Sequence, residues 1–95
     1  MGYKIEYKKR FVNDLYKVVV YLENEWGNKV ADEFAERLSN ALDILASHPY
    51  IGAPSKIVKG ARGLSITPHN RLFYKIKNNT IIILKLADTR EKGYH

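Results

Sequence analysis

Residues 11–28, which read FVNDLYKVVVYLENEWGN, decide the fold. Apolar side chains recur there at spacings of four, three, four and four residues, at Phe11, Leu15, Val18, Leu22 and Trp26. This period places them on one stripe of an α-helix. Gly27 predicts the end of that helix, because a residue in the left-handed conformation is least costly as glycine.

A second helix is predicted directly after the first. Asn28 is a good N-cap residue. The apolar stripe that follows is formed by Val30, Phe34, Leu38, Ala41, Leu42 and Leu45, and Pro49 stops it. Two amphipathic helices joined by so short a turn run antiparallel. We therefore expect a helical hairpin whose acidic residues lie on the solvent side.

Strand patterns flank the hairpin. Tyr3, Ile5 and Tyr7 alternate with polar residues, which predicts a short strand over residues 3–7. Residues 49–63 are rich in glycine and proline and predict a loop. Three strands are expected after it, at about 62–67, 71–77 and 80–87, with turns at 67–70 and 78–79. The predicted fold is α+β in one domain, residues 1–95: a short N-terminal strand, an antiparallel two-helix hairpin, then a three-stranded antiparallel meander.

The meander sorts its side chains by face, because successive strand residues point to opposite sides. The residues expected to cover the helices are Leu72, Tyr74, Ile76, Ile82, Leu84 and Leu86. The opposite face is expected to mix cations with apolar side chains, namely Arg71, Phe73, Lys75, Lys77, Ile81, Ile83 and Lys85. Such a mixture predicts a surface that a partner covers.

Charge is distributed unevenly along the chain, whose net charge is +6. Residues 11–48 hold three basic and seven acidic side chains (−4), whereas residues 49–95 hold nine basic and two acidic ones (+7). Positive potential gathered on one half of a small protein attracts a phosphate backbone, an anionic membrane surface or an acidic protein. The alternative is a basic surface with no such partner.

Composition argues against several classes of protein. The chain has no cysteine, so disulfides and thiolate metal sites are excluded. The histidines at 48, 69 and 95 lack metal-ligand spacing, and no cofactor motif is present, so we expect no cofactor. No apolar segment follows Met1, from which we expect no signal peptide, no membrane partner and a cytoplasmic location.

Arginines are the strongest candidates for a binding or catalytic site. In an antiparallel meander the start of the second strand lies beside the end of the third, so Arg71 and Arg90 are expected to converge, with Arg62 further away. Guanidinium groups bind phosphate bidentately and stay charged at any relevant pH. The alternative is an ion pair, for instance between Arg90 and Asp88 or Glu91. The side chains expected to bind nucleic acid are Arg62, Lys56, Lys59, Lys75 and Lys85.

His69, Tyr94 and His95 are the candidates for proton transfer. Imidazole titrates near neutrality, and a phenol transfers a proton when its pKa is shifted. The alternatives are a solvated histidine in a turn and a frayed C-terminal tail.

Several segments occur in a recognisable order along nearly the whole chain: Tyr21-Leu22-Glu23, Glu25-Trp26-Gly27, Pro49-Tyr50-Ile51-Gly52, Arg62-Gly63-Leu64, Asn70-Arg71-Leu72-Phe73-Tyr74 and Asp88-Thr89-Arg90. Together they resemble the RelE/ParE superfamily of toxin–antitoxin toxins. The resemblance implies a helical hairpin against an antiparallel sheet, with the first strand added at an edge. RelE-like and YoeB-like members cleave mRNA in the ribosomal A site, whereas ParE-like members poison DNA gyrase.

The resemblance also implies roles for single residues. Arg71 and Arg90 match catalytic arginines of the nucleases, and Arg62 stands where RelE-like toxins have a catalytic lysine. Tyr94-His95 is similar to the YoeB-like C-terminus, in reversed order. The chain departs from the nuclease pattern twice, with Ser55 in place of a glutamate and Leu64 in place of a second lysine.

We therefore predict the toxin of a bacterial type II toxin–antitoxin pair, acting as a ribosome-dependent endoribonuclease on mRNA. Its catalytic residues would be Arg71, Arg90, His69, Tyr94 and His95. The alternatives are a ParE-like gyrase poison without nuclease activity, a non-toxic nucleic-acid-binding module, and an inactivated family member retained for interaction. The implied partners are a cognate antitoxin and the ribosome with its mRNA, or DNA gyrase in the first alternative.

Overall fold

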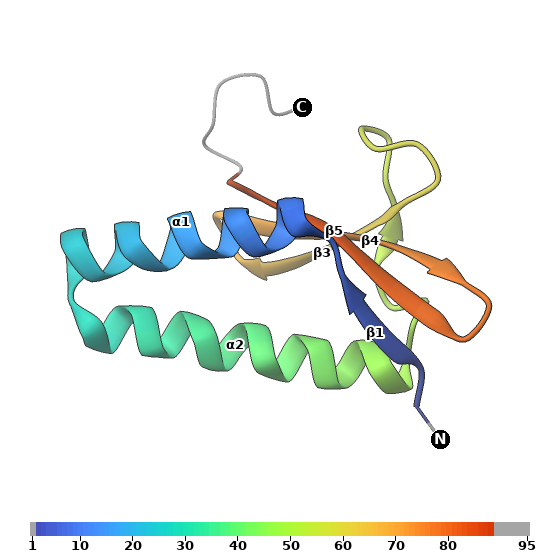
Figure 1. Cartoon of the computed structure of the whole chain (residues 1–95), viewed down its shortest axis with the longest axis horizontal. Helices are drawn as coiled ribbons and strands as arrows, with labels where there is room; N and C mark the ends of the chain where they lie inside the picture. The colour runs from blue at the N-terminus through green and yellow to red at the C-terminus, as the bar shows by residue number, and fades with distance from the viewer. Residues whose placement is uncertain (1, 89–95) are drawn as a thin grey trace.

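The computed structural model describes residues 2–88. Its elements follow one another as β1 (Lys4–Tyr7), α1 (Lys9–Trp26), α2 (Asn28–Ser47), β2 (Ala53–Pro54), β3 (Arg62–Thr67), β4 (Asn70–Lys77) and β5 (Thr80–Asp88) (Figure 1). The order of strand, helical hairpin and three-stranded meander confirms the predicted α+β class.

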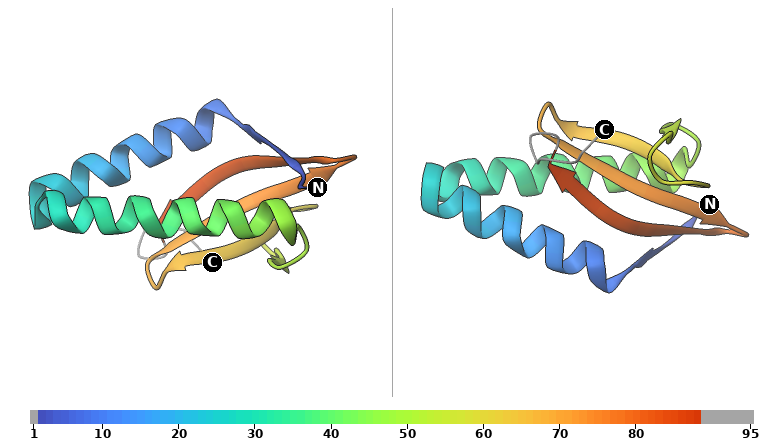
Figure 2. Two further views of the ribbon diagram at one scale, coloured as in Figure 1. Left: turned by 90° about the horizontal axis from the view of Figure 1, so that it is seen from below. Right: turned by 90° about the horizontal axis from the view of Figure 1, so that it is seen from above.

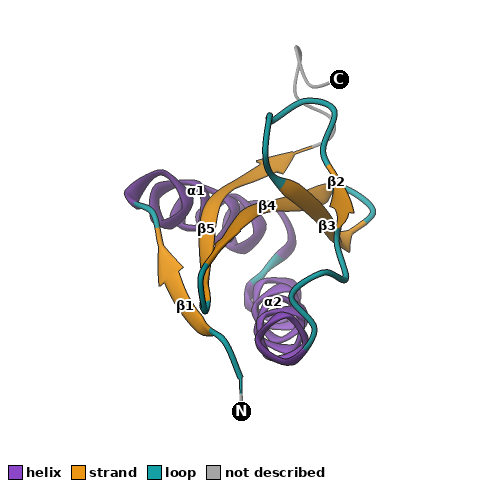
Figure 3. Ribbon diagram, turned by 90° about the vertical axis from the view of Figure 1, so that its right-hand side faces the viewer, coloured by secondary structure: helices purple, strands orange, loops and turns teal. Residues whose placement is uncertain are grey.

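The strands form one five-stranded sheet in the order β1-β5-β4-β3-β2 (Figure 3). β1 pairs with β5 in parallel at one edge, and the other neighbouring strands are antiparallel. The prediction of an uninterrupted loop over residues 49–63 is wrong at β2, where Ala53 and Pro54 pair with Gly63 and Arg62. Proline, which lacks an N–H, is compatible with such an edge strand.

The two helices run antiparallel, with α1 beside β5 and α2 beside β3. Their connecting turn projects past the end of the sheet (Figures 1 and 2). Gly27 makes this turn, at φ 94° and ψ 170°. Its N–H donates to the carbonyls of Leu22 and Glu23, and its own carbonyl accepts from the N–H of Ala31. Gly27 therefore caps both helices, and the prediction of Asn28 as the N-cap is wrong.

The hydrophobic core lies between the helices and the sheet. Its buried members are Phe11, Phe34, Leu38, Leu45, Ile66, Leu72, Tyr74, Ile81, Ile83 and Leu86. The stripes predicted on the two helices contribute the first four of these. The prediction is wrong for Trp26, the last residue of the first stripe, which is 65% exposed because it lies at the end of α1. No helix within residues 2–88 is long and apolar enough to cross a membrane.

One predicted face assignment is wrong because β5 carries a β-bulge. Phe73 pairs with Lys85, but the next residue, Tyr74, pairs with Ile83. Leu84 is therefore the extra residue, and the alternation of faces along β5 shifts by one position. As a result Ile81 and Ile83 are fully buried in the core with Leu86, instead of lying on the outward face.

Candidate functional site on the outward face of the sheet

Arg71 lies on the face of the sheet that points away from the helices. Its cross-strand partners are Ser65 on β3 and Ala87 on β5. The next residue, Leu72, is fully buried in the core beneath the helices. Because strand residues alternate between faces, the Arg71 side chain belongs to the opposite face. The outward face of β3, β4 and β5 is therefore the candidate site.

The guanidinium of Arg71 is held against β3. Nη1 donates to Oγ of Ser65 at 3.1 Å, and Nη2 donates to the carbonyl oxygen of Gly63 at 3.3 Å. A Cβ atom at residue 63 would lie 2.5 Å from Nε and 3.0 Å from Cζ of Arg71. The absence of a side chain at Gly63 thus makes room for the guanidinium.

Beside Arg71, the outward face is centred on Phe73. This ring is fully buried although it lies on the outer side, and the Nζ of Lys85 stands 5.4 Å from the ring centroid. A cation over an aromatic face is attracted by the ring quadrupole, while its aliphatic stem covers apolar surface. The predicted mixture of cations and an aromatic residue is confirmed at Arg71, Phe73 and Lys85.

The remaining predicted lysines border this face. Lys75 is exposed on β4, and its Cε lies 3.8 Å from an ideal Cβ position at Gly60. Lys56 and Lys59 are exposed in the loop between β2 and β3. That loop is closed by the N–H of Ser55, which donates to the carbonyl of Ala61. The loop and Lys75 therefore bring further positive charge to one side of the sheet.

Arg62 lies on the other face. It pairs across the sheet with Tyr74, a core residue, so both side chains point to the helix side. Its Nη1 donates to the carbonyl of Gly52 at 2.6 Å and to that of Tyr50 at 3.4 Å, and its Cζ stands 4.9 Å from the Tyr50 ring centroid. The structure thus does not bring Arg62 together with Arg71.

The segment that leaves α2 is fastened by Tyr74. The buried hydroxyl of Tyr74 donates to the carbonyl of Pro49 at 2.8 Å and accepts from the N–H of Gly52 at 2.9 Å. Burial raises the pKa of Tyr74 above its ordinary value of 10.0, although the hydrogen bond from Gly52 and the charge of Arg62 act in the opposite direction. Tyr74 and Arg62 together fix the segment that leads into β2.

His69 lies in the turn between β3 and β4, with an exposed side chain. Its N–H donates to Oγ1 of Thr67 at 3.1 Å. The side chain lines a groove of about 310 Å³ on the helix side of the molecule, opposite Tyr21 and Trp26. His69 and Arg71 therefore border different surfaces.

Arg90, Tyr94 and His95 lie outside the described residues, so their predicted roles stay predictions. The last described residue of β5, Asp88, pairs with Asn70, which precedes Arg71. No group of three or more histidine or acidic side chains suited to a metal ion occurs within residues 2–88.

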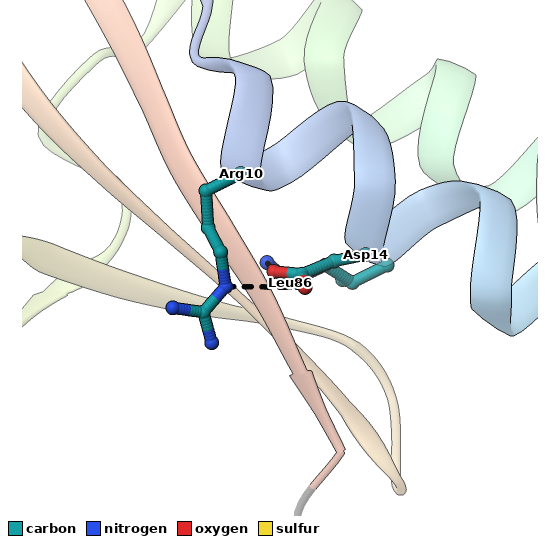
Figure 4. Close-up of polar contacts among 3 residues, drawn as sticks. All are labelled: Arg10, Asp14 and Leu86. Atoms are coloured by element: carbon teal, nitrogen blue, oxygen red, sulfur yellow. Dashed lines mark hydrogen bonds and ion pairs between the residues drawn. The ribbon is translucent and has the colours of Figure 1, made fainter.

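Asp14 fixes the end of β5 that lies beside Arg71. Its Oδ2 accepts from the N–H of Leu86 at 3.1 Å, and its Oδ1 accepts from Nε of Arg10 at 3.2 Å (Figure 4). β1 pairs with β5 only as far as Ile83, so Asp14 satisfies an edge donor that no strand reaches. The expectation that acidic residues lie on the solvent side is wrong for Asp14, which is 14% exposed.

Sequence analysis did not predict four roles: those of Gly63 and Ser65 beside Arg71, that of Asp14 at the β5 edge, and that of the Tyr74 hydroxyl at the exit of α2. The sequence did contain a signal that Arg62 points toward the helices. Arg62 shares one strand face with Leu64 and Ile66, and these two apolar residues indicate the face that covers the core. No local signal pointed to Asp14, since its partner Leu86 is 72 residues away in the chain.

A two-helix hairpin on one face of a five-stranded sheet, with Arg71 and Lys85 on the other face, defines a class of small α+β proteins. Residues 5–93 match the family described as "ParE toxin of type II toxin-antitoxin system, parDE". The chain therefore belongs to this family, within the RelE/ParE superfamily of type II toxin–antitoxin toxins.

Known relatives agree with this assignment. Toxin ParE1 of Caulobacter vibrioides is 24% identical over 87 residues, which are 92% of this chain and 91% of the relative. The chromosomal ParDE system of P. aeruginosa matches with a TM-score of 0.77 at 18% identity, covering 92% of this chain and 96% of that one. The RelBE2 toxin–antitoxin complex of Mycobacterium tuberculosis matches with a TM-score of 0.65 at 20% identity, covering 93% of this chain and 99% of that one. The two structural likenesses establish the fold.

Proposed function

We propose that this toxin inhibits growth by binding the complex of DNA gyrase with DNA through the outward face, and that it does not itself cut RNA. The observation that carries the proposal is the surroundings of Arg71. Within residues 2–88, its guanidinium has a hydroxyl and a backbone carbonyl as partners, Ser65 and Gly63, and not a carboxylate. No carboxylate of residues 2–88 neutralises this charge, which supports an anionic target.

RNA cleavage makes a chemical demand that the surroundings of Arg71, as far as residues 2–88 form them, do not meet. The attacking 2′-hydroxyl must lose a proton and the leaving 5′-oxygen must gain one, which calls for an acid and a base within hydrogen-bond reach. Within residues 2–88, the neighbours of Arg71 on the outward face are Ser65 and Ala87 across the strands and Phe73 along β4, and none of these carries an imidazole or a carboxylate. His69, the nearest imidazole in sequence, borders the helix-side groove instead.

The match to the ParE toxin family supports the gyrase target, since ParE-like members are the gyrase poisons of the superfamily. Sequence analysis placed mRNA cleavage ahead of gyrase poisoning. The order proposed here is the reverse, and it is supported by the described surroundings of Arg71 and by the family match.

Ribosome-dependent mRNA cleavage is the second candidate, and one observation favours it. Asp88 pairs with Asn70, so β5 ends beside the start of β4, where Arg71 stands. Arg90 follows Asp88 by two residues in the sequence. Two converging arginines would stabilise charge on a phosphoryl group, by about 10²–10³-fold for each well-placed donor.

An antitoxin partner belongs to the same proposal. The structural relatives include toxin–antitoxin complexes, among them RelBE2 of Mycobacterium tuberculosis and DinJ–YafQ of E. coli. An acidic antitoxin segment would neutralise the cations of the outward face, and its binding would weaken with added salt.

The test compares two assays on the same purified toxin. In the first, gyrase and supercoiled DNA are incubated with toxin, and trapped cleaved DNA is measured. In the second, ribosome-bound transcripts are examined by primer extension. We expect cleaved-complex trapping with intact mRNA. Arg71→Ala is expected to weaken trapping roughly 10- to 100-fold, the loss typical of a central charged contact.

Lys29→Ala is the matched control, because it removes one positive charge from an exposed position on α2. It should leave trapping unchanged. Codon-phased cuts in mRNA without trapped gyrase would select the second candidate. Absence of toxicity in cells would remove both and leave a binding module.

A further inference from the structure

Gly63 occupies an unusual place for a glycine. It lies inside β3, paired with Phe73 and Ala53, where glycine weakens a strand because it has no side chain to pack and loses more backbone entropy. The positive-φ glycines within residues 2–88 are Gly27 and Gly60, so the backbone at Gly63 does not require glycine. The close approach of Arg71 does: the nearest atoms to a Cβ at residue 63 are Nε, Nη2 and Cζ of Arg71.

We propose that Gly63 and Ser65 are positioning residues that hold the Arg71 guanidinium flat against β3, and so determine where an anionic group of the target binds on the outward face. The inference rests on the proposed function to the extent that the target anion is bound by Arg71. The chemical class of that group is a phosphodiester or a carboxylate, both of which match the planar guanidinium.

Two hydrogen bonds from different nitrogens restrict the guanidinium more than one would. Nη1 donates to Ser65 and Nη2 donates to Gly63, so rotation about the last bonds of the side chain breaks one contact or the other. A guanidinium has five N–H donors, and these two bonds leave three for a target. An arginine ordered before binding loses less conformational entropy when the target arrives.

The atoms that a Cβ at residue 63 would meet first belong to the flexible end of Arg71 and not to the backbone. Gly63→Ala is therefore expected to displace the guanidinium and leave the sheet intact. Alanine has less backbone entropy to lose than glycine, so the folded protein should be equally or more stable. A purely structural role for Gly63 would instead couple any loss of activity to a loss of stability.

The experiment compares the wild-type toxin with Gly63→Ala, Ser65→Ala and Ser65→Thr, and uses Ser39→Ala on the exposed surface of α2 as the control. Thermal unfolding reports stability. The ¹⁵N–¹H resonances of the Arg71 side chain report whether rotation of the guanidinium is restricted. Gyrase trapping and growth inhibition report activity.

We expect restricted Arg71 rotation in the wild type and free rotation in Gly63→Ala, with an unchanged or higher unfolding midpoint and a loss of potency of roughly tenfold. Ser65→Ala is expected to lose roughly 2- to 10-fold, as one hydrogen bond is removed. Ser65→Thr keeps the hydroxyl and should retain potency, and Ser39→Ala should match the wild type.

Free rotation of Arg71 in the wild type would overturn the inference. So would full potency of Gly63→Ala with a displaced guanidinium. If Gly63→Ala fails to fold, Ser65→Ala and the wild-type resonances still decide the question. Restricted Arg71 rotation in a toxin that does not trap gyrase would support the positioning role while the proposed target fails, because the resonances are measured without a target.

Discussion

Tyr74→Phe tests how the exit of α2 is held to the sheet. Tyr74 is fully buried, and its hydroxyl bridges two backbone groups of a neighbouring segment, the carbonyl of Pro49 and the N–H of Gly52. Both of those residues are themselves buried. Phenylalanine keeps the ring and removes only the bridging atom, so the change isolates these two hydrogen bonds.

The expected cost follows from the groups left behind. A buried donor or acceptor that loses its partner costs about 1–3 kcal/mol, and Tyr74→Phe leaves one of each. Partial relaxation of the segment lowers the sum, which gives a loss of about 2–4 kcal/mol in the free energy of unfolding. For a chain of this size that loss lowers the unfolding midpoint by roughly 10–30 °C. The protein should remain folded at 25 °C, since small domains have about 5–15 kcal/mol of stability.

Urea unfolding followed by far-ultraviolet circular dichroism measures this loss. Tyr16→Phe is the matched control, because Tyr16 is 71% exposed and the same chemical change there should cost less than about 0.5 kcal/mol. Amide hydrogen exchange adds a local readout, in which Gly52 should lose protection in Tyr74→Phe. A Tyr74→Phe protein within 0.5 kcal/mol of the wild type would refute the reasoning.

Three further predictions concern other contacts. Gly27→Ala should lower the free energy of unfolding by about 1–3 kcal/mol, because φ is 94° there although nothing lies within 4 Å of the new Cβ. The control Asn28→Ala should lower it by less than about 0.5 kcal/mol, as chemical denaturation would measure. Equal losses would contradict the capping role of Gly27. Asp14→Ala should lower the free energy of unfolding by about 1–3 kcal/mol in chemical denaturation, because the N–H of Leu86 loses its acceptor. Asp14→Asn should lower it less, because the asparagine side chain still offers an acceptor oxygen. A larger loss in Arg10→Ala, which removes the exposed partner of the ion pair, would refute this. Burial raises the folded pKa of Tyr74 above its ordinary value of 10.0, so its contribution to stability is complete below about pH 10 and is lost as the pH rises through the folded pKa. As the pH rises above about 10, Tyr74→Phe should therefore lose less stability than the wild type, and parallel pH profiles would contradict this.

The helices could be predicted well because their signal is local. Each apolar stripe repeats with the period of a helix, and the stripe residues Phe11, Phe34, Leu38 and Leu45 are buried as expected. The turn at Gly27 was also visible, although not its second role as the cap of α2.

The faces of β5 could not be predicted, because residues 81–84 are apolar at every position and satisfy either alternation. The choice depends on the bulge at Leu84, and the bulge depends on pairing with β4. With Leu86 beneath the helices, the bulge brings Ile83 and Ile81 to the same side, and the core is filled by these two instead of Ile82 and Leu84.

The candidate site was predictable in its charge and not in its geometry. Sequence reasoning identified Arg71 and the surrounding lysines from their number and from their alternation in β4. It did not identify the contacts that orient Arg71, because these come from β3, six and eight residues earlier, and depend on the register between the two strands. It placed Arg62 further from Arg71 but still among the residues expected to bind nucleic acid, whereas the register places the two arginines on opposite faces of the sheet.

The alternation of β4 separates the residues that stabilise the toxin from the residue that, under the proposed function, binds its target. Leu72 and Tyr74 face the helices, and a change there reaches the core or the exit of α2. Arg71 faces outward, and the terminal nitrogens of its flexible side chain donate to the Ser65 hydroxyl and the Gly63 carbonyl on β3. Stability and potency should therefore vary independently at neighbouring positions, except at Phe73. That ring is fully buried on the outward face and lies beneath the Lys85 ammonium, so its replacement should lower both together.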